Sequence, residues 1–236
     1  MGRQLLTFLV LALLTFGVYS NHFENAFHFD DFHAIVDNAR IHSLADPLKF
    51  FRDPAAFSVL TTHQVFRPVV SLSLALDWHL SGGAKPLWFH ISTFFWFLVL
   101  LAVLRALFGR LLESSGWAWF ATAIFAFHPV SAETVNYVIQ RGDLYATLGI
   151  SSALWIFATL PKYRRFGLYL IPFAAGALAK TTALIFPLIL IGYILLYEES
   201  EWKPALARIV PAVAVTAAIG WWAAKMTGAA FTPGSY

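Results

Sequence analysis

The chain has 236 residues, of which 59% are hydrophobic and only 12% are charged, and its formal net charge is +3. A soluble domain of this length has too little interior to hide that much apolar surface, so lipid is the expected solvent for much of the chain. The absence of cysteine excludes disulfides and thiolate metal sites, and the basic residues are scattered rather than clustered, which excludes a nucleic-acid partner.

Apolar runs along the chain predict an all-α integral membrane protein with about seven transmembrane helices. The first run follows the charged start Met1-Gly-Arg-Gln and resembles a signal peptide, but Tyr19-Ser-Asn-His is not a small-x-small cleavage site, so a retained helix is expected. Residues 1–236 are interpreted as a single membrane domain. The predicted spans are Leu5–Tyr19, Leu87–Phe108, Trp117–Phe127 with its extension, Leu144–Leu160, Phe166–Ala179, Thr182–Tyr197 and Ala205–Ala224.

Charge determines how the run 166–197 is divided and how the chain is oriented. It is either one long helix or two helices that turn at Ala179-Lys180-Thr181. With two helices, the short loops on one side carry only Arg141, Lys180 and Lys225, which is the positive-inside pattern and predicts a cytoplasmic N-terminus. The membrane is then the bacterial inner membrane or, in a eukaryote, the endoplasmic reticulum. The opposite side carries Arg3, Arg105, Arg110, Lys162, Arg164, Arg165, Lys203 and Arg208.

The long loop of roughly residues 21–86 is expected on the outer face. It contains seven of the 13 acidic residues and six of the eight histidines. Its amphipathic segments are predicted to lie on the membrane rather than cross it, and Pro68 and Gly82-Gly83 are typical of the start and end of the longest one. These segments are Asp31–Ser43, Pro54–Gln64 and Arg67–Leu80.

Acids and cations gather in the outer loops of this topology. A carboxylate of the Asp30-Asp31 pair is a candidate general base, and Arg141 and Lys180 suit the stabilisation of a leaving phosphate. Arg67 lies where the long loop returns to the membrane. Taken singly, each has a commoner explanation, because adjacent acids are usually surface charge or a helix cap, and cations at helix ends usually reflect topology.

Histidines in the long loop raise a metal alternative. Imidazole is the commonest protein ligand for transition metals, and Asp30 and His33 stand three residues apart, but no established ligand motif is present. No metal is therefore expected, with Asp30 and His33 as the alternative. His90 within the second run would suit axial binding of a haem or pigment, although a hydrogen bond to its neighbours is the commoner role. The other loop histidines considered are His22, His28, His42 and His63.

Four blocks of sequence, in this order and spacing, resemble the transmembrane O-mannosyltransferases that carry TPR repeats and their bacterial relatives. The first-loop block is Asn25-x-Phe-x-Phe-Asp-Asp-x-x-x-Ile-x-x-Asn38. The others are Phe66-Arg-Pro-Val-Val-Ser-Leu-Ser-Leu-Ala-Leu-Asp77 with Phe89-His90, Phe125-Ala-Phe-His-Pro-Val-Ser-Ala-Glu-Thr-Val135 continuing to Arg141-Gly-Asp143, and Ala179-Lys180-x-x-Ala-Leu-x-x-Pro187.

The resemblance implies a GT-C type helical bundle that moves a sugar, with inversion, from a polyprenyl phosphate to a hydroxyl acceptor such as a protein Ser or Thr. It implies Asp30 or Asp31 as the base and no cofactor beyond the lipid-linked donor. Arg141, Lys180 and Arg67 would bind the donor phosphate. Glu133, Asp143 and His128 would be supporting polar groups.

Two positions depart from the family pattern. Thr181 follows Lys180 where the family often has Glu, and the chain ends at Thr232-Pro-Gly-Ser-Tyr236 where the family continues. We therefore expect a chain that is truncated relative to the family. The alternative function is a non-catalytic GT-C-like accessory subunit of a larger membrane complex.

Overall fold

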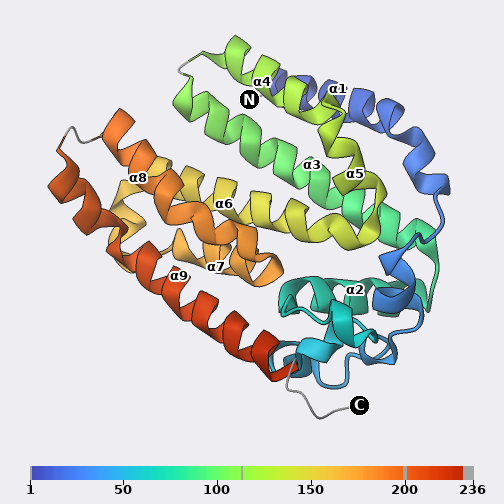
Figure 1. Ribbon diagram of the computed structural model, residues 1–236. Coiled ribbons are helices and arrows are strands. Elements are labelled where there is room, and N and C mark those ends of the chain that lie inside the picture. Colours follow the sequence, from blue (N-terminus) through green and yellow to red (C-terminus); the bar gives the residue numbers. More distant parts are fainter. Residues whose placement is uncertain (1, 113, 199–200, 231–236) are drawn as a thin grey trace.

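The computed structural model describes residues 2–112, 114–198 and 201–230, and all regular elements among them are helices (Figure 1). The C-terminal Thr232–Tyr236, on which the expectation of truncation rests, lies outside the described residues. The α-helices are α1 (Gly2–Val18), α2 (Pro68–Ser81), α3 (Pro86–Leu111), α4 (Ser115–Phe127), α5 (Val130–Asn136), α6 (Arg141–Thr159), α7 (Leu170–Ala179), α8 (Phe186–Tyr197) and α9 (Trp202–Ala230).

Each of the seven apolar runs contains a helix, but seven full spans are not confirmed. Only two described helices, Pro86–Leu111 and Trp202–Gly228, are long and apolar enough to cross a membrane. Helices α4 and α7 have 13 and 10 residues, which is well short of the ~20 that a perpendicular span needs. Apolar side chains nevertheless face outward on the short helices too, for example Leu13 at 70% and Leu188 at 69% exposure, which favours a lipid environment.

The helices form one continuous packed series (Figure 1). Helix α4 packs beside α1 and α3, α3 packs on α6, and α6 packs on α7, which α9 also contacts. Two glycines allow α6 and α7 to approach closely, since a Cβ atom on Gly149 would lie 2.5 Å from the carbonyl oxygen of Pro172. The run 166–197 is indeed divided, because the backbone becomes extended at Lys180 (φ −155°, ψ 134°) and α7 ends there.

The long loop folds against one end of this series. It contains α2 together with short helical turns, so the longest predicted segment is confirmed, while the two shorter ones form isolated turns. Helix α2 begins at Pro68 and ends where Gly82 takes a left-handed conformation (φ 67°), which glycine adopts without steric cost. Ile35 and Phe50 are buried, and His42 stacks on Trp78 at 3.5 Å between ring centroids, so the loop is an integral part of the core.

Basic residues gather at the end of the helices away from the long loop. Arg105 contacts Gln4 and Ser115 there, and Arg164 makes a two-point ion pair with Glu198, at 2.8 and 2.6 Å. Arg105 and Arg164, which the sequence assigns to the same side of the membrane, thus both lie at this end of the fold.

Candidate functional site: a polar pocket beside an apolar groove

A polar pocket of about 270 Å³ lies where the long loop meets the starts of α2 and α6 and the end of α7. Because α7 ends at Ala179, Lys180 is free to project into this pocket, and Arg67 enters it as the residue that precedes α2. The polar side chains that line the pocket are Asp30, His33, Thr62, His63, Arg67, Gln140 and Lys180.

Asp30 is the accessible carboxylate of the acidic pair. Its side chain is 49% exposed, and Oδ1 lies 3.2 Å from Nε2 of His33. Its backbone N–H donates a hydrogen bond of 2.8 Å to the Tyr137 hydroxyl, and burial raises the pKa of Tyr137 to about 12, so that hydroxyl remains protonated. Phe29, the preceding residue, has a positive φ of 44°, a strained conformation of the kind that clusters at functional sites.

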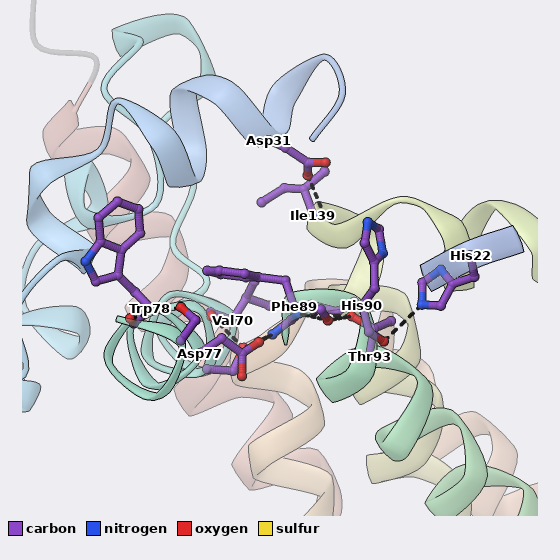
Figure 2. Close-up of polar contacts among 12 residues, drawn as sticks. His22, Asp31, Val70, Asp77, Trp78, Phe89, His90, Thr93 and Ile139 are labelled. Carbon is purple, nitrogen blue, oxygen red and sulfur yellow. Dashed lines mark hydrogen bonds and ion pairs between the residues drawn. The ribbon is translucent and has the colours of Figure 1, made fainter. Parts of the chain in front are cut away.

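Asp31 is buried, at 1% exposure, and links the first loop to the segment before α6. Its two carboxylate oxygens accept backbone hydrogen bonds from Ile139 at 3.0 Å and from His28 at 3.1 Å, and Figure 2 shows its carboxylate directed at Ile139. Burial raises the pKa of Asp31 to about 6, against the lowering effect of those two hydrogen bonds. Both oxygens are thus already occupied, which suits a positioning role for Asp31.

The two cations of the pocket are held by different means. Lys180 Nζ forms an ion pair of 2.5 Å with Asp143 Oδ2, so Asp143 supports the lysine as a polar neighbour. The Arg67 guanidinium lies over the ring of Phe57, at 5.0 Å from its centroid. Burial lowers the pKa of Arg67, while the nearby Asp143 and Asp30 raise it. Two positive charges therefore face the same small volume as the Asp30 carboxylate.

Arg141 lies in the interior of the fold rather than in the polar pocket. It is fully buried, and its guanidinium donates to Asp77 Oδ2 at 2.5 Å, to the Phe89 carbonyl at 3.0 Å and to Thr93 Oγ1 at 2.9 Å. Figure 2 shows Asp77, Phe89 and Thr93 gathered around these contacts. This arrangement joins α2, α3 and α6 through a single side chain. Arg141 and Asp77 are 64 residues apart in the sequence, so no local pattern predicts that they form an ion pair.

The remaining predicted residues lie away from the pocket. His128 is exposed at the end of α4, where its Nδ1 accepts a hydrogen bond from the Val130 N–H. Glu133 is exposed and accepts a hydrogen bond from Gln140 at 3.3 Å. His90 is buried against His22, with 4.4 Å between the ring centroids, and its carbonyl contacts the ring of His22 at 2.9 Å.

An apolar groove of about 600 Å³ is bounded by α2, α3, α6 and α7. Its lining includes Val69 on α2, two residues after Arg67, and Gly176 on α7, whose carbonyl accepts a hydrogen bond from the Lys180 N–H. The walls are otherwise contributed by side chains such as Leu72, Leu76 and Trp96. Helices α2, α6 and α7 therefore line the apolar groove and border the polar pocket at their ends, a pairing that suits an amphiphile with a charged head.

Comparison with known proteins supports the resemblance seen in the four blocks. The chain is 30% identical over 191 residues to protein O-mannosyl-transferase Tmtc2 of Drosophila melanogaster, an alignment that covers 75% of this chain and 20% of that protein. It is 30% identical over 156 residues to protein O-mannosyl-transferase TMTC4 of Mus musculus (59% of this chain, 21% of that protein), and 28% identical over 146 residues to TMTC3 of Homo sapiens (59% and 15%).

The predicted resemblance to O-mannosyltransferases is thereby confirmed, and the chain spans about one fifth of the length of the TMTC4 and Tmtc2 relatives. No family model and no solved structure matches the chain.

Proposed function

We propose that the chain is a membrane glycosyltransferase unit that transfers a sugar from a polyprenyl phosphate to a protein hydroxyl. The observation that carries the proposal is the convergence of one accessible carboxylate and two cations, Asp30, Arg67 and Lys180, in a pocket at the ends of helices that also line an apolar groove. The names of the relatives supply mannose as the sugar and protein as the acceptor.

The donor fits the two adjoining compartments by its chemistry. A polyprenyl chain buries apolar surface in the groove, at about 25 cal/mol for each Å² removed from water. Its phosphate then lies in the polar pocket, where Lys180 and Arg67 supply charge-assisted hydrogen bonds. Before the donor binds, Asp143 holds Lys180 in position through their ion pair. The donor phosphate then competes with the Asp143 carboxylate for the same ammonium group.

The reaction proposed for this pocket is a single displacement. Asp30 accepts the proton from the acceptor hydroxyl, the acceptor oxygen forms a bond to the anomeric carbon, and the bond from that carbon to the phosphate oxygen breaks. Polyprenyl phosphate leaves with the bonding electrons, and Lys180 and Arg67 stabilise the negative charge that develops on it. Attack from the side opposite the phosphate inverts the sugar.

Asp31 and Arg141 act as positioning residues in this proposal. Asp31 fixes the backbone of the first loop to Ile139, and so determines where the neighbouring Asp30 points. Arg141 holds the start of α6 against α2 and α3, which sets the distance between the polar pocket and the groove. The expected topology is multi-pass, with the N-terminus in the cytoplasm and the polar pocket on the outer face, and the distribution of basic residues among the short loops favours it.

The test is transfer of radiolabelled mannose from a polyprenyl-phosphate mannose to a Ser/Thr-containing protein acceptor by the purified full chain. Asp30→Asn should abolish transfer, whereas the matched control Asp37→Asn, an exposed acid of the same loop, should retain it. Equal activity of wild type and Asp30→Asn would remove the proposed base. Donor binding without any transfer by the wild type would contradict the catalytic assignment and favour the accessory-subunit alternative.

A further inference from the structure

Three groups with metal-ligand chemistry meet on one wall of the polar pocket. Asp30, His33 and His63 each offer an atom, and these atoms all lie within 4.8 Å of one another. The two imidazole rings are 4.9 Å apart between centroids, and they come from turns separated by 30 residues of the long loop. Folding of the loop, rather than a local sequence motif, therefore creates this cluster.

The contacts of His33 leave one of its ring nitrogens available to a ligand. Its Nδ1 lies 2.9 Å from Ser58 Oγ, and that hydroxyl is also 3.3 Å from the Leu60 carbonyl, to which it donates. In the tautomer in which the His33 Nδ1–H donates to Ser58 and the Ser58 hydroxyl donates to Leu60, Nε2 carries the lone pair. This pattern, in which one nitrogen is anchored by a neighbour and the other is free, is typical of a metal-binding histidine.

The other ring nitrogen of His33 lies close to an anion but makes no hydrogen bond to it. His33 Nε2 is buried, makes no hydrogen bond of acceptable geometry, and lies 3.2 Å from Asp30 Oδ1. In that tautomer the Nε2 lone pair and the Asp30 carboxylate repel each other, and either a proton on Nε2 or a metal ion between the two atoms relieves the repulsion. His63 is exposed on the open side of the same space, and its Nδ1 lies 3.0 Å from Thr62 Oγ1.

We propose that Asp30, His33 and His63 bind one divalent transition-metal ion, with Zn²⁺ as the preferred class because two imidazoles and one carboxylate suit it. Tetrahedral bonds of about 2.0–2.1 Å place ligand atoms roughly 3.4 Å apart, so the site closes by little more than one ångström. The exposed His63 ring makes that movement. The fourth position remains open toward the polar pocket.

The role of the ion rests on the proposed function, whereas its binding does not. An ion at this wall adds positive charge to that of Arg67 and Lys180, and its open position suits an oxygen of the donor phosphate. Coordination through one oxygen of Asp30 leaves the second oxygen able to accept a hydrogen bond from the acceptor hydroxyl.

The experiment measures binding of Zn²⁺ to the purified full chain by calorimetry, with the visible absorption of Co²⁺ as a second readout. Wild type should bind one ion per chain, and His33→Ala and His63→Ala should each weaken binding by at least about tenfold. The matched control His79→Ala, an exposed histidine of the same loop outside the cluster, should bind as wild type does. His63→Ala keeps the proposal testable if His33→Ala fails to fold, because His63 is exposed.

Unchanged affinity in His63→Ala, or no saturable binding in the wild type, would overturn the metal site. Sugar transfer that persists after complete removal of metal, with no saturable binding, would overturn this inference and leave the proposed function standing. Specific binding of the ion by a chain that transfers no sugar would support the metal site and overturn the proposed function.

Discussion

The buried ion pair between Arg141 and Asp77 gives the sharpest test of the fold, because removal of either partner leaves a charge in the interior. Arg141 is fully buried, and the side chain of Asp77 is 8% exposed. Breaking such a pair by removing one partner costs about 3–5 kcal/mol. Against a total stability of roughly 5–15 kcal/mol, each of Asp77→Asn and Arg141→Met should therefore be severely destabilising.

The double variant separates the ion pair from general disruption. If the two effects were independent, Asp77→Asn with Arg141→Met would cost about 6–10 kcal/mol, the sum of two losses of about 3–5 kcal/mol. Because the second substitution removes the charge that the first one orphans, we expect the double variant to fall short of that sum by about 2 kcal/mol or more. The carbonyl of Phe89 and the hydroxyl of Thr93 still lose their donor, so wild-type stability should not return.

The assay is reversible chemical unfolding in mixed micelles, followed by tryptophan fluorescence, with polyprenyl-phosphate affinity measured on the same samples. Arg141→Met with wild-type stability and a selective loss of lipid-phosphate affinity would refute the reasoning. That result would return Arg141 to the donor-binding role that the family resemblance implies. Additive losses in the double variant would equally refute direct coupling between the two charges.

Two further predictions concern the packing away from the polar pocket. Gly149→Ala should lower the thermal unfolding midpoint of the detergent-solubilised chain, because the added Cβ atom meets the Pro172 carbonyl backbone and α6 must separate from α7; an unchanged midpoint would contradict this close approach. Burial raises the pKa of Glu198, but hydrogen bonds from Arg164 and Arg208 lower it below its ordinary value of 4.5. Wild type should therefore have a higher thermal unfolding midpoint than Glu198→Gln above pH 4.5, and this difference should disappear as the pH falls through the lowered pKa of Glu198. A difference in midpoint that does not change with pH would argue against the ion pairs.

The sequence predicted those parts of the fold that depend on local pattern. Apolar runs located the helices, Pro68 and Gly82 delimited α2, and the charge distribution divided α7 from α8 at Lys180. The lengths were predicted less well: α7 and α8 begin four residues later than their apolar runs, at Leu170 and Phe186, whereas α9 begins three residues earlier, at Trp202.

The candidate site was only partly predictable, since it depends on contacts between distant segments. Asp30, Arg67 and Lys180 were identified from residue type and position in the loops, and the structure brings all three into one pocket. The pairing of Arg141 with Asp77 and the approach of His63 to His33 required the long loop to fold on α2, which no spacing in the sequence encodes. The sequence likewise gives no reason to distinguish Asp30 from Asp31. The structure shows that Asp31 is buried and that Asp30 is accessible.

The most direct test of the account is the affinity of the purified full chain for polyprenyl-phosphate mannose, measured at equilibrium in micelles. Lys180→Met and Arg67→Met should each weaken binding by about tenfold, since each removes a charge-assisted contact of roughly 1.5 kcal/mol or more. Lys162→Met, an exposed cation at the opposite end of the fold, should bind as tightly as wild type. Equal affinities in all four proteins would contradict the assignment of the polar pocket to a lipid-linked phosphate.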